Sequence, residues 1–464
     1  MWKTIRYNLL TGLLILPVMS CYASEEDLII INKLKKMSLT ELMNVEVFNP
    51  SASLAARKEQ KFSETPAALF VLTQEDIRRA GITSIPEALR MVPGVQVARV
   101  DANQWIISAR DFNDQSSGKL VVMIDGRAVH SPLRSQTNWD FQSTLIEDIE
   151  RIEVIKGPGA ALWGANAVNG VINIITKSAK DTQGVLITNS FGKGEEQNVL
   201  GVRYGGKVGE NAHYRIYSQF YEHDSFVDAL GADQNDNWQM KRAGFNMDWA
   251  ASENDNFTLE AGIYDGFMKS NSFNMISTER LNSTDKVSGL HLLSRWQHKM
   301  DSGEMILQSY FNRVKRNQIY LQSTHNIYDI DFQHRSQLSD KHEFMWGLGF
   351  RYTDSSIDNS EFTSYIPNNK KYNLFSAFVQ NEFIVTDDLR LIIGSKFEQN
   401  HSTGFEIQPN IRMLWNINEK HSMWAAVSRA VRTPSRIDQD LQLNIIIPHS
   451  PKLLISGNPE LNSE

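Results

Sequence analysis

After Lys180 the chain alternates between apolar and polar residues in segments of strand length. Examples of such segments are residues 242–249, 257–264, 389–397 and 407–417. A period of two sustained over about eight to ten residues predicts strands with one buried and one exposed face, and about thirteen such segments lie between residues 183 and 430. In residues 343–352, one face holds Phe344, Trp346, Leu348, Phe350 and Tyr352, and the other holds Glu343, Met345, Gly347, Gly349 and Arg351.

Two features of these segments favour a transmembrane β-barrel over a soluble β-sandwich, which would show the same alternation. Many segments reach the roughly 9–11 residues that a tilted strand needs to cross a bilayer. Aromatic residues gather toward segment ends, as at Trp249, Trp296 and Trp346, where a membrane interface favours amphipathic rings. Short connections also alternate with long polar ones, as in outer-membrane barrels. We therefore expect part of a transmembrane barrel over residues 179–464.

Residues 61–178 have a mixed α/β pattern. Thr73 and Ser84 each precede a short predicted helix, and Gly81 and Pro93-Gly94 end these helices. The pattern predicts a compact second domain. Its short apolar strands, separated by polar turns, are expected at Val95–Ala98, Trp105–Ser108, Leu120–Ile124, Ile152–Ile155 and Val171–Thr176.

Composition and the N-terminus narrow the class of protein. The 464 residues are 41% hydrophobic with a mean hydropathy of −0.36, and no apolar run approaches the roughly 18 residues of a membrane-spanning helix. Residues 1–23 are expected to be a signal peptide, because Lys3 and Arg6 precede a short apolar stretch and Ala23 follows it. A buried helix and lipidation of Cys21 are the alternatives. Cleavage would remove the single cysteine and two positive charges, taking the net charge from −7 to −9, which argues against a nucleic-acid partner.

A glycine-rich stretch stands out near the end of the α/β domain. Gly157, Gly159, Gly164 and Gly170 are placed where tight turns are expected. A nucleotide-binding loop is excluded, because the third glycine of G-x-G-x-x-G would fall on Leu162, and because the element after Gly170 is predicted to be a strand.

Several motifs occur in an order that resembles TonB-dependent outer-membrane receptors. They are IERIEVIKGPGAALWGANAVNGVINIITK (149–177), the upstream ETPAALFVLTQEDIRRAGITSIPEALRMVPGV (64–95) and KLVVMIDGR (119–127), and SRAVRTPS (428–435) with SGNPELNSE (456–464) near the other end. The resemblance implies a mixed α/β plug domain inside an antiparallel transmembrane β-barrel of roughly 22 strands, of which about 13–14 are present here. The plug-motif positions are Asp125, Gly126, Gly157, Pro158, Gly159, Gly164, Gly170 and Asn173.

The resemblance also implies a protein partner, TonB of an inner-membrane energy-transducing complex. Residues 24–60 would be a periplasmic lead-in, and its TonB box is expected at Val45, Glu46, Val47 and Phe48, judged by the distance ahead of the plug helices. The box would bind by β-augmentation, in which an extended strand offers main-chain hydrogen bonds to an edge of the partner. A plain linker is the alternative.

For a ligand, the resemblance points to outward-facing turns of the plug. Arginine suits anionic carboxylate or catecholate ligands, because its guanidinium is permanently charged and bidentate, and tryptophan offers a stacking surface. Alternatively, some of these arginines pair with acidic residues of the barrel wall. Asp111 stands where glycine is expected in an RGF turn, and Asp tolerates a positive φ less well. The candidate binding residues are Arg99, Trp105, Arg110, Arg134, Gln136 and Trp139.

Metal binding and catalysis have little support. The eleven histidines include no H-x-x-x-H pair. Asp224, Asp228, Asp233 and Asp236 in one long loop would suit Ca²⁺, although a solvated acidic loop is favoured. No nucleophile elbow, zinc motif or phosphate loop occurs, so we predict no enzyme, no resident metal and no cofactor.

We therefore expect active transport of a scarce nutrient chelate across the bacterial outer membrane. A ferric siderophore is the favoured ligand and cobalamin is the alternative. The chain stops at Asn462-Ser463-Glu464 inside a loop motif, where the family is expected to continue to a terminal aromatic residue. A C-terminally truncated, non-transporting receptor remnant is therefore a further alternative, and a soluble β-rich binding protein is another.

Overall fold

The computed structural model describes residues 51–54, 57–58, 60–61, 64–110, 118–192, 196–273, 280–418, 421–445 and 453–464. The chain divides into two units, Met1–Asn49 and Pro50–Glu464, and all described residues belong to the second. The predicted signal peptide (1–23), the predicted TonB box (45–48) and Asp111 lie outside the described residues. No helix among the described residues is long and apolar enough to cross a membrane.

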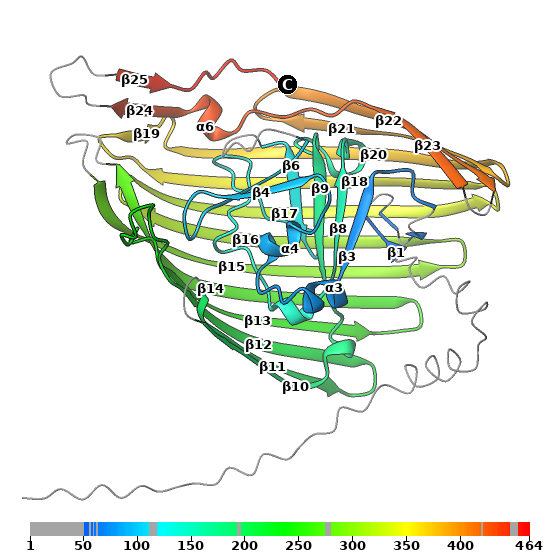
Figure 1. Ribbon diagram of the computed structural model, residues 1–464. Helices are drawn as coiled ribbons and strands as arrows, with labels where there is room; N and C mark the ends of the chain where they lie inside the picture. Colours follow the sequence, from blue (N-terminus) through cyan, green and yellow to red (C-terminus); the bar gives the residue numbers. More distant parts are fainter. Residues whose placement is uncertain are drawn as a thin grey trace, which may run out of the picture. The chain divides into compact units, whose positions relative to one another are not determined.

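Thirteen antiparallel strands form one large sheet, which we call the wall (Figure 1). Each strand pairs with its neighbours along the chain, and β10 and β23 are the two edges among the described residues. The predicted antiparallel sheet is confirmed. Its strands are β10 (Gly184–Phe191), β11 (Glu196–Val208), β12 (Ala212–His223), β13 (Trp238–Ala250), β14 (Asp255–Phe273), β15 (Arg280–Met300), β16 (Gly303–Gln318), β17 (Leu321–Ser339), β18 (His342–Asp358), β20 (Asn369–Thr386), β21 (Leu389–Asn400), β22 (Gly404–Asn418) and β23 (His421–Ser428).

The wall buries its polar face and exposes its apolar face. In β22, Phe405, Ile407 and Ile411 are 60%, 44% and 51% exposed, whereas Glu406 and Gln408 are 6% and 0% exposed. A sandwich in water would bury the apolar residues instead. The alternation predicted from the sequence is therefore that of a membrane wall, which is apolar outside and polar inside.

The two ends of the wall differ in their connections. At one end, which we call the turn end, short turns such as 251–254, 301–302 and 340–341 join the strands. At the other, the loop end, residues 224–237 and 359–368 form longer connections. A separate three-stranded sheet lies at the loop end and follows the order β19-β24-β25. The loop-end elements are β19 (Thr363–Tyr365), α6 (Arg436–Gln439), β24 (Leu441–Ile445) and β25 (Leu453–Ser456).

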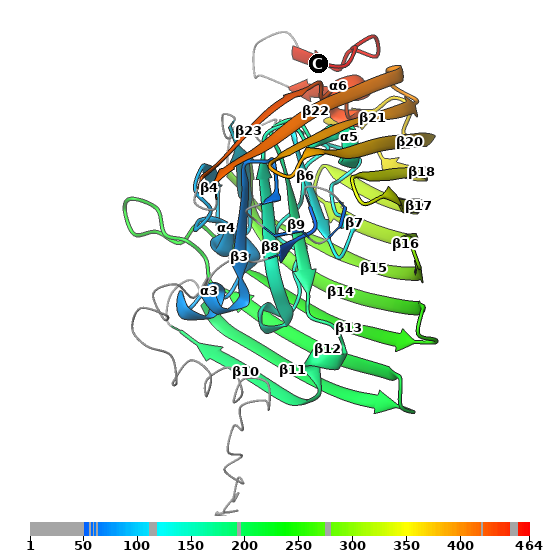
Figure 2. The same cartoon turned by 90° about the vertical axis from the view of Figure 1, so that its right-hand side faces the viewer.

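A second, smaller sheet with its helices forms the plug, which lies against the inner face of the wall (Figure 2). Its strand order is β3-β8-β9-β6-β7, and only the β6–β9 pair is parallel. The plug elements are β1 (Ser51–Ala52), β2 (Gln60–Lys61), β3 (Leu69–Thr73), α3 (Gln74–Arg79), α4 (Ile85–Leu89), β4 (Val95–Arg99), β5 (Trp105–Ala109), β6 (Leu120–Ile124), β7 (Arg127–Ala128), η2 (Ile146–Asp148), β8 (Ile149–Lys156), α5 (Ala160–Trp163) and β9 (Gly170–Thr176), and η3 (Lys180–Thr182) leads into the wall.

Local sequence explains the main plug elements. Thr73 begins α3 with a capping box, because its hydroxyl accepts from the Asp76 N–H while the Asp76 carboxylate accepts from the Thr73 N–H. β9 is buried on both faces: Val171 and Ile172 are each 0% exposed and belong to separate apolar clusters. This double burial explains why the sequence of β9 is continuously apolar instead of alternating.

Polar side chains of the wall hold the plug. Arg295 of β15 donates to the Asp125 carbonyl. Asp148 of the plug pairs with Arg203 of β11 and with Arg215 of β12. Polar groups on the buried face of the wall therefore find hydrogen-bond and ion-pair partners in the plug as well as on neighbouring strands.

We predict that Asp125→Ala destabilises the plug more than Asp125→Asn. Asp125 has a φ of 51°, and its carboxylate accepts from the Thr176 N–H at 2.8 Å and the Thr176 hydroxyl at 3.0 Å. Asn tolerates this left-handed conformation and keeps an acceptor oxygen, whereas Ala does neither. The alanine variant should lose about 1–3 kcal/mol of unfolding free energy relative to the asparagine variant, because it leaves donors unsatisfied. Urea unfolding in detergent micelles measures the difference, and equal stabilities would contradict the prediction.

Candidate functional site

A cavity of about 310 Å³ lies at the loop end between the plug and the wall, and we call it the loop-end cavity. Plug residues from the β4–β5 turn and from segment 129–142 form one side. Side chains of β14, β15, β16 and β17, together with Tyr365 of β19, form the other side. The lining side chains with polar or aromatic groups include Asp101, Asn103, Trp105, His130, Arg134, Gln136, Trp139, Asp140, Asp285, Asn312, Arg316, Gln318, His325 and Tyr365.

Segment 130–137 is a turn that presents Arg134. His130 and Thr137 form an antiparallel bridge, and within it the Ser135 N–H donates to the Ser131 carbonyl at 2.8 Å. Arg134 lies between these two serines and is exposed. Within the part of the chain that the structure describes, its guanidinium has no ion-pair partner. The turn therefore offers a positive charge to an anionic ligand.

Trp105 and Trp139 contribute aromatic surface to the lining. Trp139 is 6% exposed. Trp105 meets Trp238 of β13 edge-on, with 5.7 Å between the ring centroids. Trp139 belongs to the apolar core of the plug, so only a small part of its ring faces the cavity. Trp105 is half-buried and its packing fixes it, so the exposed part of its ring is a preformed surface for a ligand.

Two wall residues that the sequence analysis did not identify complete the site. Arg316 of β16 lies between two carboxylates, 3.3 Å from Asp140 and 3.7 Å from Asp285. His325 of β17 is 4% exposed, and neither of its ring nitrogens has a hydrogen-bond partner among the described residues. A neutral imidazole offers one donor and one acceptor, so His325 can bind a polar group of a ligand.

Burial shifts the pKa values of several plug groups around this cavity. Desolvation raises the pKa of Asp101 and the pKa of Asp140 above the usual range of a carboxyl. Burial, together with the Arg351 guanidinium, lowers the pKa of His130 to about 3, so its ring is neutral.

Arg99 and Arg110 do not line the loop-end cavity. The Arg99 guanidinium stacks over the rings of Trp105 and Phe226, 4.6 and 4.5 Å from their centroids, and so joins the β4–β5 hairpin to the loop 224–237. Arg110 has a φ of 56°, and its side chain lies beside Gly157. Of the six predicted binding residues, the structure brings together Trp105, Arg134, Gln136 and Trp139.

The glycines of the predicted plug motif lie where backbone or wall groups approach closely. A Cβ on Gly170 would lie 2.4 Å from the Ile155 carbonyl oxygen. Gly164 has a φ of 85°, and a Cβ there would lie 2.4 Å from the Glu398 carboxylate of β21. That carboxylate accepts from the Ala165 N–H at 2.8 Å, so the missing side chain lets the wall reach the plug backbone.

A larger cavity of about 750 Å³ lies between the plug and the wall, and we call it the interior cavity. The plug-motif residues Asp125, Gly126 and Asn173 line it. Arg436 of α6 lines it as well and marks its loop-end limit.

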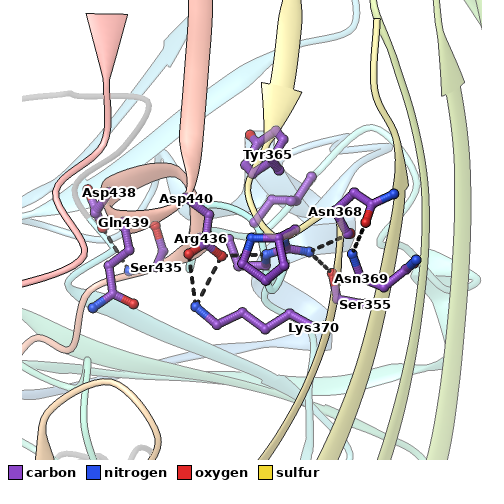
Figure 3. A network of polar contacts seen from close by, with 12 residues as sticks. Ser355, Tyr365, Asn368, Asn369, Lys370, Ser435, Arg436, Asp438, Gln439 and Asp440 are labelled. Atoms are coloured by element: carbon purple, nitrogen blue, oxygen red, sulfur yellow. Dashed lines mark hydrogen bonds and ion pairs between the residues drawn. The ribbon is translucent and has the colours of Figure 1, made fainter.

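Arg436 ties α6 to the wall through a buried network (Figure 3). Its side chain is 3% exposed. Its Nε donates to Asp440 at 2.8 Å, and one Nη donates to the Ser355 hydroxyl of β18 at 2.8 Å. Lys370 of β20 also pairs with Asp440, at 2.9 Å. This network holds the segment that follows the SRAVRTPS motif against the loop end of the wall.

The acidic residues of the loop 224–237 bind backbone groups. Asp228 accepts from the Leu230 and Ala232 N–H groups. Asp236 accepts from the Ala102 N–H of the plug at 2.8 Å. Among the described residues, no group of three His, Cys, Asp or Glu side chains is placed to hold a metal ion.

Curated relatives of the chain include transporters and iron-regulated receptors. The vitamin B12 transporter BtuB of Vibrio cholerae is 30% identical over 162 residues, which cover 35% of this chain and 26% of the relative. The iron-regulated outer membrane virulence protein of V. cholerae is 22% identical and covers 88% of this chain and 63% of the relative. The ferric enterobactin receptor of Pseudomonas aeruginosa is 21% identical and covers 82% and 61%. The chain thus spans less than two thirds of the length of these relatives.

Solved structures share the fold. The siderophore receptor PirA of Acinetobacter baumannii superposes with a TM-score of 0.71 at 16% identity, covering 86% of this chain and 67% of PirA. A mutant of the ferric enterobactin receptor PfeA of P. aeruginosa gives a TM-score of 0.69 at 19% identity, covering 86% and 67%.

Two family models match nearly all of the described unit. The TonB-dependent receptor plug domain matches residues 61–171, and the TonB-dependent receptor-like β-barrel matches residues 180–464. The fold and the relatives agree with these matches, and the family consists of outer-membrane receptors and not of enzymes. The chain belongs to the TonB-dependent receptor family of the outer membrane.

Proposed function

We propose that this protein binds a ferric siderophore at the loop-end cavity and imports it across the outer membrane in a TonB-dependent manner. The observation that supports the proposal best is the lining of that cavity by plug and wall together. Arg134 supplies an exposed guanidinium, Trp105 supplies a half-buried ring that packing fixes, and Trp139 adds a small part of its ring. A ferric catecholate or carboxylate chelate carries the negative charge and the flat groups that such a lining binds.

The wall side of the cavity adds selectivity. Arg316 is already flanked by Asp140 and Asp285, so its charge is compensated. His325 has unpaired ring nitrogens among the described residues and would bind a hydroxyl or carbonyl of the ligand. The combination favours an anionic chelate with hydrogen-bonding groups over a purely apolar ligand.

Cobalamin is the second candidate ligand. The observation that favours it is the 30% identity to the vitamin B12 transporter BtuB over about a third of the chain. That match is shorter than the matches to the iron-regulated and ferric enterobactin receptors, which cover more than 80% of the chain. We therefore place the ferric siderophore first.

The test is uptake of iron-labelled enterobactin and of labelled cyanocobalamin. Both are measured in a receptor-deficient Gram-negative strain with and without the full chain in its outer membrane. We expect accumulation of the iron chelate that requires the chain and stops when a protonophore collapses the proton-motive force. Equal accumulation of every ferric chelate tried, with and without the chain, would contradict the iron proposal, and accumulation of cyanocobalamin alone would establish the alternative.

Arg134→Gln should weaken binding of the ferric chelate. Loss of one charge-assisted contact is expected to raise the dissociation constant by about tenfold and to reduce its dependence on salt concentration. Isothermal titration with ferric enterobactin measures the change. Arg90→Gln is the matched control, because Arg90 is an exposed plug arginine that pairs with Glu87 and does not line the cavity. Equal affinities of the two variants would contradict the assignment of Arg134.

Val47→Pro should abolish uptake while leaving ligand binding intact. Proline lacks the N–H that a paired strand donates, so it blocks β-augmentation by TonB. Val47→Ala is the control, because it keeps the main-chain donor and should retain most of the uptake. Normal uptake by the proline variant would show that the TonB box does not include Val47.

A further inference from the structure

Three basic side chains lie together on the outer, apolar face of the wall. They are Lys286 of β15 and Arg313 and Lys315 of β16, and all three are exposed. Strand alternation puts Lys286 on the same face as Leu292 of β15, which is 53% exposed. It puts the two β16 residues on the face opposite to the buried Asn312. We call Lys286, Arg313 and Lys315 the basic triad.

The register of β15 and β16 makes the basic triad compact. Lys286 pairs with Asn317, so Lys315 is its diagonal neighbour on the adjacent strand, at a separation of about 7–8 Å. Arg313 is two residues from Lys315 and shares its face. Like charges that are this close repel one another, and an anion held between them would relieve the repulsion.

The basic triad has no counter-charge on its own face of the wall. Within the described part of the chain, none of its members belongs to an ion pair, and the six positions directly opposite them are uncharged. The acidic residues nearby on this face are matched to other cations. Asp265 of β14 lies directly opposite Lys241. Asp354 of β18 lies directly opposite Lys371. The six uncharged positions are Phe267, Ser288, Leu290, Asn317, Thr324 and Asn326.

A groove of about 610 Å³ lies on the same face of the wall, and we call it the outer groove. Ser294 of β15 and Ser309 of β16 are directly opposite each other in it, and Ala261 of β14 adds a third small side chain. Small residues at neighbouring positions leave a hollow between larger ones. The large apolar side chains in the lining are Phe245, Leu259, Leu292, Phe311, Tyr328 and Ile330.

The basic triad lies next to the outer groove on the side of the loop end. Phe311 lines the groove, and Arg313 and Lys315 follow it by about 7 and 13 Å along β16. Outer-membrane barrels have their long loops on the extracellular side. The outer groove is therefore at the depth of the acyl chains of the outer leaflet, and the basic triad is at the depth of the headgroups.

The two features together define the chemistry of a ligand. A free phosphate ion would contact the triad and leave the groove empty, and an uncharged lipid would fill the groove and leave the triad without an anion. A lipid with a phosphate on its headgroup satisfies both. Long basic side chains suit this arrangement, because their stems cover apolar surface while their charged ends reach the headgroups.

We propose that the basic triad and the outer groove together bind a phosphate-bearing lipid of the outer leaflet. Its phosphate lies among Lys286, Arg313 and Lys315, and an acyl chain lies across Ser294 and Ser309. The lipid occupies the face of the wall that points away from the plug. This site does not depend on the proposed transport function, and it adds a lipid partner to the protein.

The test measures the binding of lipid A, a glycolipid with two phosphates and several acyl chains, to the full chain purified in detergent. Native mass spectrometry reports the bound lipid and its apparent dissociation constant. The triad variant carries Lys286→Gln, Arg313→Gln and Lys315→Gln together. The groove variant is Ser309→Trp, which places an indole in the outer groove. Heat-modifiability on gels verifies that each variant is folded.

A matched control removes the same amount of charge from the other end of the wall. It carries Lys207→Gln, Lys299→Gln and Lys341→Gln, three exposed residues at the short turns 209–211, 301–302 and 340–341. We expect this control and the unaltered chain to bind lipid A with dissociation constants within about twofold of each other, because exposed charges far from the ligand contribute little.

The triad variant should bind lipid A about tenfold or more weakly, because it loses its charge-assisted contacts with the phosphate. The groove variant should bind about fivefold or more weakly, because the indole displaces the acyl chain from its apolar contacts. Removing the phosphates from lipid A should weaken its binding to the unaltered chain and have little effect on the triad variant. Equal affinities of the triad and control variants, unchanged binding by Ser309→Trp, or no binding of lipid A by the unaltered chain would each overturn the proposal, whatever the uptake measurements show.

Discussion

The buried polar face of the wall is the constraint on which the other features of the structure depend. Glu406 and Gln408 of β22 are 6% and 0% exposed, and such groups are costly to bury without partners. The plug supplies part of those partners, as when Asp148 pairs with Arg203 and Arg215. Removing one member of a buried ion pair typically costs about 3–5 kcal/mol, because the other charge is left uncompensated. Wall and plug therefore stabilise each other, because buried polar groups of each would lose hydrogen-bond or ion-pair partners without the other.

The same constraint explains where the cavities lie. Where plug carbonyls or carboxylates meet the wall closely, the motif glycines let the backbone approach, as at Gly164 and Glu398. Where they do not meet, polar side chains of both layers border open space, and the Asn173 side-chain oxygen has no hydrogen-bond partner among the described residues. The residues that hold the plug and the residues proposed to bind a solute therefore belong to the same inward-facing polar set. The distance between plug and wall at each point decides which of the two roles a residue has.

Sequence reasoning predicted the wall strands and most plug elements from the periodicity and the caps of single segments, although it missed β3 and α5. The outward direction of the apolar face needed more, namely the segment lengths, the aromatic ends and the alternation of short and long connections, because a sandwich has the same periodicity. Sequence reasoning did not predict which wall residues lie opposite a given plug turn, since that depends on strand register and on how the plug sits in the wall. Arg99 and Arg134 illustrate the difficulty: each occurs near a tryptophan in the sequence, yet Arg99 stacks on Trp105 while Arg134 is exposed at the cavity. His325 lies in no motif, and it is identified only by its burial without a hydrogen-bond partner in the described part of the chain.

The central claim is that the loop-end cavity binds the metal chelate, and an iron anomalous difference map tests it most directly. Crystals of the full chain grown with ferric enterobactin should show an iron peak within the loop-end cavity, near Arg134 and Trp139. An iron peak elsewhere on the protein, or an empty loop-end cavity at saturating chelate, would contradict the account.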